Sequence, residues 1–113
     1  MLTIAALKEF GANTAEGMAR CLNNEALYLK LVNMGLKDEN FERLKAALDA
    51  RDTVQAFEAA HALKGSLGNL ALTPLYEPIS ALAERLRGQT GPVDVEDLTA
   101  VIFERIDLAR ALL

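Results

Sequence analysis

The sequence has no tryptophan, only 5% aromatic residues, a single cysteine and a single histidine among 113 residues. So few aromatic side chains leave little material for a surface that stacks nucleic-acid bases. The lone cysteine, Cys21, cannot form an internal disulfide and is more typical of a small buried apolar residue than of a reactive thiol. No apolar run approaches the length of a membrane span, and no basic stretch leads into an apolar run at the N-terminus. We therefore expect a cytoplasmic protein without a signal peptide.

Positive charge is also scarce. Twelve Lys and Arg residues stand against sixteen Asp and Glu residues, for a formal net charge of −4, and the basic residues are scattered along the chain. This distribution disfavours binding to nucleic acid or to an anionic membrane. With 51% hydrophobic and 25% charged residues, the chain has enough apolar material for one core and does not have the composition of a disordered segment. The sequence predicts one domain spanning residues 1–113, which we expect to be monomeric, and the start at Met1 favours a standalone protein.

Helical periodicity runs through nearly every segment, and no convincing strand alternation interrupts it. The predicted helices cover about residues 3–10, 13–24, 25–34, 38–48, 52–70, 73–88 and 94–112. Side chains suited to capping a helix N-terminus stand at four of the starts: Asn13, Asp38, Asp52 and Asp94. The clearest loop is the Gly- and Pro-containing stretch 89–92. The fold class predicted is all-α, an antiparallel four-helix bundle with additional short N-terminal helices that cover one end.

Two boundaries have alternatives. The helices at 25–34 and 38–48 are separate if Gly35 stops the first one, or they form one bent helix. The inward face predicted for the first of them consists of Leu27, Tyr28, Leu31 and Met34. Thr73-Pro74 is a typical helix start, but Pro78 removes a backbone hydrogen bond. That helix therefore begins nearer Glu77, or its first turn is distorted.

The stretch 60–70 holds the chain's only histidine. At about 100° per residue, one side of this helix collects an apolar stripe formed by Ala56, Ala60, Leu63, Leu67 and Leu70. His61 lies more than about 100° from the centre of the stripe and should face outward. Lys64 and Gly65 follow one turn later, and Gly68 lies almost directly in line with His61 two turns later.

These residues are suited to phosphoryl transfer. An exposed imidazole, with an ordinary pKa of about 6.5, is largely neutral near pH 7 and has a nucleophilic ring nitrogen. The Lys64 ammonium could balance the charge of a phosphoryl group on His61, and Gly65 and Gly68 leave space above the ring for a partner. Glycine inside a helix costs about 0.5–1 kcal/mol relative to alanine, so two of them call for a reason. The alternative is that the glycines mark a helix end near Gly68. Glu58 could orient the second ring nitrogen, although a solvated carboxylate is the simpler interpretation.

The run from Ala60 to Leu70, AHALKGSLGNL, resembles the signature of histidine-containing phosphotransfer (HPt) domains, typically A-H-x-L-K-G-S followed by small residues. The resemblance extends over about residues 12–112, because the stretch 25–52 is similar to the family's preceding helical hairpin and 79–84 to its following helix. One departure is Ala71, where the family usually has another glycine. The exact shape of the helix end is therefore open.

The resemblance implies a carrier in a multistep two-component phosphorelay. In that family a receiver domain's phospho-aspartate donates to the histidine, and another receiver accepts the group. The matching residues here are His61 as phosphoacceptor, Lys64 beside the phosphate, and Gly65 and Gly68 for docking. The implied partners are receiver domains of response regulators or of hybrid histidine kinases. These would supply Mg²⁺ and the catalytic residues, so the chain is expected to be a phosphoprotein that is not itself an enzyme, with no cofactor or metal site.

Two other functions are compatible with a small helical bundle. One is an adaptor that is never phosphorylated and regulates a receiver or kinase by occupying it. A pure binder, however, has no need for both His61 and Lys64. The other is the dimerisation domain of a histidine kinase, which requires an ATP-binding domain that a chain of 113 residues is too short to hold, although the chain could be a piece of a larger hybrid kinase.

Overall fold

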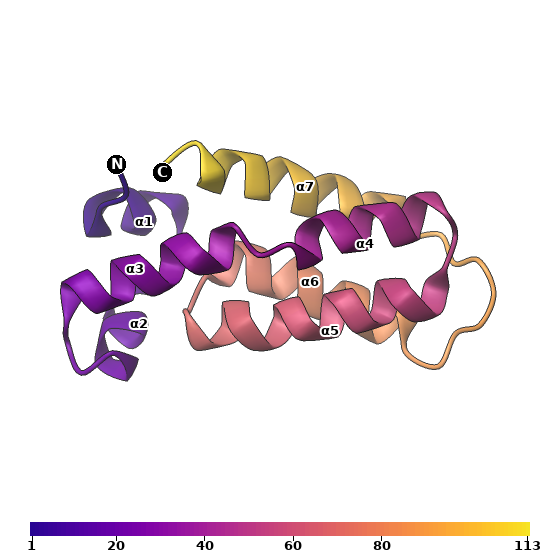
Figure 1. The fold of residues 1–113 in the computed structure, drawn as a ribbon, viewed down its shortest axis with the longest axis horizontal. Coiled ribbons are helices and arrows are strands. Elements are labelled where there is room, and N and C mark those ends of the chain that lie inside the picture. Colours follow the sequence, from indigo (N-terminus) through magenta and orange to yellow (C-terminus); the bar gives the residue numbers. More distant parts are fainter.

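The computed structural model describes all 113 residues and contains seven helices and no strands. The helices are α1 (Ile4–Phe10), α2 (Thr14–Arg20), α3 (Glu25–Leu36), α4 (Asn40–Asp49), α5 (Thr53–Asn69), α6 (Thr73–Leu86) and α7 (Glu96–Arg110). Helices α3 and α4 lie end to end as one interrupted rod, and α5, α6 and α7 run beside it in alternating directions (Figure 1). The predicted all-α bundle is confirmed. None of the seven helices combines the length and the apolar character needed to span a membrane.

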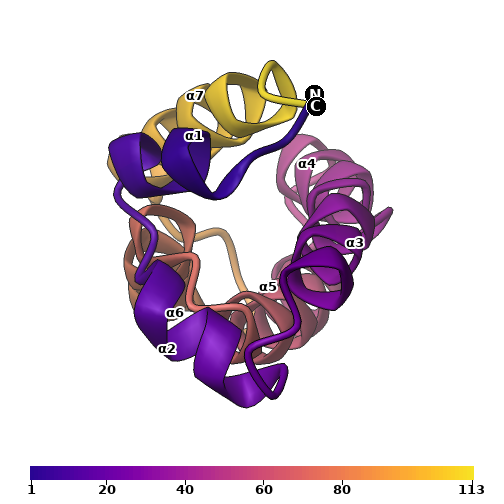
Figure 2. The ribbon, with the colours of Figure 1, turned by 90° about the vertical axis from the view of Figure 1, so that its left-hand side faces the viewer.

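The two short N-terminal helices lie at the end of the bundle where both chain termini are found (Figure 1). Seen from that end, the four rods surround the core, with α1 next to α7 and α2 below the turn between α5 and α6 (Figure 2). One cluster of 26 buried residues runs from Leu2, before α1, to Ala109 in α7. The N-terminal segment therefore contributes to the same core as the bundle.

The helix starts form where the sequence places them. The four predicted capping side chains each accept a hydrogen bond from a backbone N–H at the start of the following helix: Asn13, Asp38, Asp52 and Asp94. A cap of this kind typically stabilises a helix by about 1 kcal/mol. Asn13 and Asp52 are the N-caps of α2 and α5, whereas Asp38 and Asp94 each stand one residue before the N-cap positions of α4 and α7, Glu39 and Val95, which have no side-chain cap.

The register predicted for α3 is wrong by one position. Its buried residues are Tyr28, Val32 and Leu36, whereas Leu27 and Met34 are 39% and 60% exposed. Apolar residues cover most of the circumference of this helix, so that two faces satisfy helical spacing equally well. The packing against the rest of the bundle selects between them.

Gly35 does not stop α3, which continues to Leu36. A Cβ at Gly35 would lie 2.6 Å from Cδ1 of Leu70, so the glycine lets α3 approach the C-terminal end of α5. Residues 37–39 separate α3 from α4, which settles the open alternative in favour of two helices. Leu22, in the turn after α2, and Leu108, in α7, are large apolar side chains that are also exposed, at 89% and 57%.

Pro78 lies inside α6, which begins at Thr73. Proline has no N–H, so the carbonyl of Pro74, four residues earlier, lacks its usual donor within the helix. Nη1 of Arg105 in α7 donates to this carbonyl at 2.7 Å. The helix therefore starts early and keeps its proline because a neighbouring helix supplies the missing hydrogen bond.

Candidate functional site

His61 is exposed on α5, the longest helix. All five residues of the predicted stripe are buried: Ala56, Ala60, Leu63, Leu67 and Leu70. The side chain of Asp52 accepts from the N–H of Gln55 and caps the helix start. Packing of the stripe and this cap together fix the rotation of α5, and the outward direction predicted for His61 is confirmed.

The helix continues through Gly65 and ends at Asn69, close to the end near Gly68 that the alternative predicted, but neither glycine is the left-handed residue that stops it. The backbone of α5 is helical to Asn69, and the left-handed residue that follows is Ala71, with φ of 57°. A Cβ at Gly65 would meet no atom within 4 Å. This position therefore presents open backbone one turn after His61.

Gly68, unlike Gly65, does not have open space above its backbone. A Cβ at this position would lie 3.1 Å from Cε2 of Tyr76, because the aromatic ring from α6 lies across the glycine. The sequence could not show this contact, since it depends on where α6 returns beside α5. The Tyr76 ring occupies the space above Gly68, so a partner that binds here would contact the ring rather than the backbone of α5.

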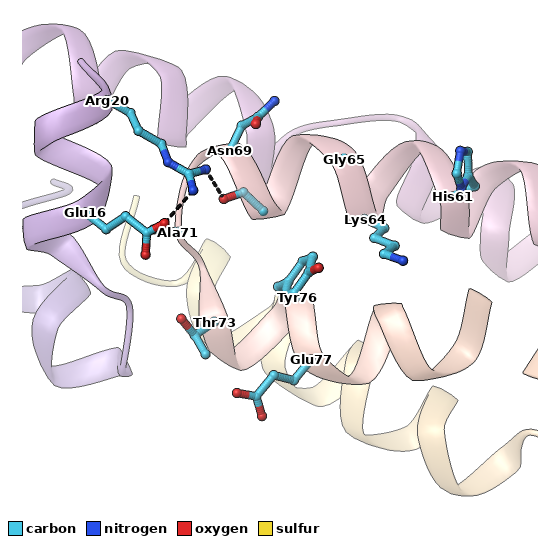
Figure 3. A pocket seen from close by; sticks show the side chains of 11 residues that line it. Glu16, Arg20, His61, Lys64, Gly65, Asn69, Ala71, Thr73, Tyr76 and Glu77 are labelled. Carbon is cyan, nitrogen blue, oxygen red and sulfur yellow. Dashed lines mark hydrogen bonds and ion pairs between the residues drawn. The ribbon is translucent and has the colours of Figure 1, made fainter. Parts of the chain in front are cut away.

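The four predicted site residues share one groove of about 610 Å³ between α2, α5 and α6 (Figure 3). Its lining residues are Glu16, Arg20, His61, Lys64, Gly65, Gly68, Asn69, Ala71, Thr73, Tyr76 and Glu77. His61 stands at one end, whereas Glu16 and Arg20 of α2 stand at the other. The groove is open and most of its lining residues are polar or charged, which suits contact with another protein's surface better than enclosure of a small molecule.

The two charged or titratable side chains of the signature are unpaired. Lys64 is half-buried and extends towards α6, and it forms no hydrogen bond or ion pair within the chain (Figure 3). His61 also makes no hydrogen bond, so Glu58 does not orient its ring. Both groups are therefore available to an incoming phosphoryl group.

Sequence reasoning missed Arg20. Its Nη1 donates to the carbonyl oxygen of Gly68 at 2.8 Å, and its other terminal nitrogen pairs with the carboxylate of Glu16. The N–H of Asn13 donates to the carbonyl of Ala71 at 2.9 Å. The capping motif of α2 is visible in the sequence, but its long-range partners are not. The Gly68 carbonyl also accepts from the N–H of Ala71, so Arg20 is an additional donor to it, and the two long-range contacts together tie the α2 segment to the end of α5 and the turn after it.

Tyr28 of α3 completes this arrangement. Its hydroxyl donates to the carbonyl of Leu70 at 2.9 Å, and the ring is fully buried against Gly17, where any side chain would overlap it. Burial raises the pKa of the Tyr28 phenol above its ordinary value, and the nearby Cys21 thiol adds to the rise. The phenol therefore stays protonated and keeps donating to α5.

The structure brings no three His, Cys, Asp or Glu side chains close enough together to hold a metal ion. Two carboxylates line the groove, but Glu16 pairs with Arg20 and Glu77 stands apart from it, so they do not form a ligand cluster. The chemistry available at the groove is therefore that of a nucleophilic imidazole beside a free ammonium group.

Comparison with known proteins agrees with this geometry. A family model described as the Hpt domain matches residues 38–112, a range that includes the whole of α4, α5, α6 and α7. No curated protein and no solved structure matches the chain. Hpt domains are phosphocarrier modules of two-component signalling that interact with receiver domains. Because the match covers well over half of the 113 residues, this chain belongs to the Hpt domain family.

Proposed function

We propose that the protein accepts a phosphoryl group on His61 from the phospho-aspartate of one receiver domain and passes it to another. The observation that carries this proposal is the position of the chain's single histidine. It is exposed in the middle of the longest helix, at one end of a groove lined by Lys64 and Gly65. The partners proposed are receivers of response regulators or of hybrid histidine kinases.

The transfer itself is a nucleophilic displacement at phosphorus. The lone pair of one ring nitrogen forms the P–N bond while the P–O bond to the aspartate carboxylate breaks, and the carboxylate leaves with that electron pair. The proton on the other ring nitrogen of His61 remains there. The return step to a second receiver reverses these bond changes. An exposed ring allows both partners to approach in line with the reacting nitrogen.

Lys64 has an electrostatic role in this proposal. Its unpaired ammonium, one turn after His61, can move towards the transferring group and stabilise its negative charge. Gly65 provides open backbone against which a receiver can press. Gly68 contributes to docking indirectly, because it allows the Tyr76 ring to lie close to α5 and form the floor of the groove.

We also propose that residues 1–113 form one folding unit, although the family match begins at residue 38. The buried residues Tyr28, Val32 and Leu36 all precede the match and belong to the common core. A fragment comprising residues 38–113 should therefore lack the cooperative thermal transition of the full chain in circular dichroism. A fragment that melts as sharply and as high as the full chain would place the domain boundary at residue 38 instead.

The proposed phosphoacceptor is tested by His61→Gln. The full chain is mixed with candidate receivers carrying radiolabelled phosphoryl groups, in buffer containing Mg²⁺. Wild-type protein should acquire label that is lost in acid and kept in base, whereas His61→Gln should keep its helical content and acquire none. Labelling of His61→Gln at the wild-type level would contradict the proposal.

A matched control is Ser66→Ala. Ser66 carries a hydroxyl group that could in principle be phosphorylated, and it lies on the same helix as His61. Its hydroxyl donates to the carbonyl of Leu63 at 3.2 Å. This variant should be labelled like wild type. If no receiver labels the wild-type chain, and both wild type and His61→Gln bind and inhibit the same receiver, the protein is an adaptor that acts by occupancy.

A further inference from the structure

The imidazole of His61 stacks on the phenyl ring of Phe57, one turn earlier on α5. The ring centroids are 5.6 Å apart and the ring planes are inclined by 20°. Side chains on a helix lean towards its N-terminus, so the side chain at position i+4 naturally lies over the one at position i. The separation falls within the range of attractive aromatic pairs.

Phe57 is itself held on two sides. It is half-buried and packs against the core. The guanidinium of Arg87, just after the end of α6, lies 5.2 Å from the centroid of the phenyl ring, which is a typical cation–π distance. Arg87 is fixed in turn by the carboxylate of Glu84 at 3.1 Å. The phenyl ring is therefore a platform anchored to both α5 and α6.

The stack is the one interaction that orients the His61 ring, because this side chain makes no hydrogen bond within the chain. Histidines that bind or react are commonly oriented by a hydrogen bond to the second ring nitrogen. A hydrogen bond of that kind occupies a nitrogen. Stacking covers a face of the ring, whereas the lone pair of the unprotonated, nucleophilic nitrogen points outward in the ring plane. Phe57 can therefore restrict the ring without covering the nucleophile.

We propose that Phe57 is a positioning residue that holds the His61 imidazole edge-outward for attack on the phosphoryl group. This inference rests on the proposed function, since it assigns the orientation of the same nucleophile. An aromatic pair of this geometry favours the stacked arrangement by about threefold to tenfold. The rate of transfer from a bound receiver scales with the fraction of time that the ring is correctly placed. Loss of the stack should therefore slow transfer by up to that factor, the full effect appearing when the unstacked ring is seldom correctly placed, without weakening docking.

The test uses the full chain with Phe57→Leu, which keeps an apolar side chain of similar bulk but removes the ring. Phe57→Tyr restores an aromatic face. Phe103→Leu is the matched control, because Phe103 is also half-buried against the core but lies on α7, outside the groove. For each variant, the melting temperature, the receiver affinity and the single-turnover transfer rate at saturating phospho-receiver are measured.

Nuclear magnetic resonance adds a direct readout of the stack, because His61 is the only histidine and its two ring carbon-bound protons are readily assigned. In wild type and Phe57→Tyr, the ring current of the aromatic neighbour should shift these protons away from their positions in Phe57→Leu. Transfer should be slower in Phe57→Leu, by up to about tenfold, and near the wild-type rate in Phe57→Tyr and Phe103→Leu.

Provided that a phospho-receiver labels the wild-type chain, three results would overturn this inference. These are an unchanged rate in Phe57→Leu, equal slowing in Phe57→Leu and Phe57→Tyr, and equal slowing in the Phe103→Leu control. A fall in receiver affinity that accounts for the whole loss would also overturn it, because Phe57 would then be a docking residue. A wild-type chain that no phospho-receiver labels shows instead that the proposed function itself has failed.

Discussion

Replacing Gly65 by glutamine should change stability and phosphotransfer in opposite directions. The backbone at Gly65 is helical and a Cβ there meets no atom within 4 Å, so the substitution encounters no steric obstacle in the folded chain. Glutamine has a better helix propensity than glycine by about 0.5 kcal/mol. For a domain of this size, that gain raises the melting temperature by about 2 °C.

The same side chain should obstruct a receiver. Helical side chains lean over the preceding turn, and one turn before Gly65 is His61. The new amide would therefore cover the space that a partner must enter to reach the imidazole. We expect the rate of transfer from a phospho-receiver to fall by at least about tenfold, equivalent to about 1.4 kcal/mol in the barrier.

The assay pairs thermal unfolding with single-turnover labelling, and Ala100→Gln provides the control. Ala100 is exposed on α7, so this variant adds the same side chain away from the groove and should transfer at the wild-type rate. Undiminished transfer in Gly65→Gln would refute the docking argument. A lower melting temperature would refute the claim that the backbone at Gly65 is open.

Two further predictions concern Lys64 and Tyr28. Lys64→Ala should slow transfer by about tenfold or more while changing the free energy of unfolding by less than about 0.5 kcal/mol, as measured by labelling and by denaturant titration; an unchanged rate would show that Lys64 is only a surface charge. Tyr28→Phe should lower the free energy of unfolding by about 1–2 kcal/mol at neutral pH, because the buried carbonyl of Leu70 loses its donor. Since the folded chain raises the pKa of this phenol, the phenol's contribution to the free energy of unfolding is present below its ordinary pKa and is lost as the pH rises above about 10. The loss of stability at alkaline pH should therefore be smaller in Tyr28→Phe than in wild type. Identical pH profiles of stability in the two proteins would contradict the assignment.

Features that depend on local sequence could be predicted from the sequence. The capping side chains Asn13 and Asp52 act within three residues, so their helix starts are readable directly. The outward direction of His61 also follows from the spacing of its own helix. In α3, by contrast, apolar residues surround the helix, and local spacing cannot tell Met34 from Val32 as the inward residue.

Contacts between distant segments could not be predicted in this way. Arg20 and Gly68 are 48 positions apart, and nothing in either segment indicates that the guanidinium binds that carbonyl. The Tyr76 ring over Gly68 depends in the same way on the rotation of α6. The signature thus predicts the reacting residues, while tertiary packing decides which of the two glycines has open space above its backbone.

The departure at Ala71 shows how such packing makes an unusual residue acceptable. Alanine in the left-handed conformation costs roughly 1–2 kcal/mol relative to glycine, and Ala71 adopts this conformation with φ of 57°. Its methyl group is nevertheless buried, which contributes about 0.8 kcal/mol to the stability of the fold. Alanine also reduces the conformational entropy of the unfolded chain relative to glycine, which contributes about 0.4–1 kcal/mol more. These contributions nearly cancel the cost. The carbonyl of Ala71 also accepts from the N–H of Asn13, so the α2 segment holds the turn in place after α5. The left-handed turn at Ala71 is therefore kept by burial and by a contact from outside the matched region.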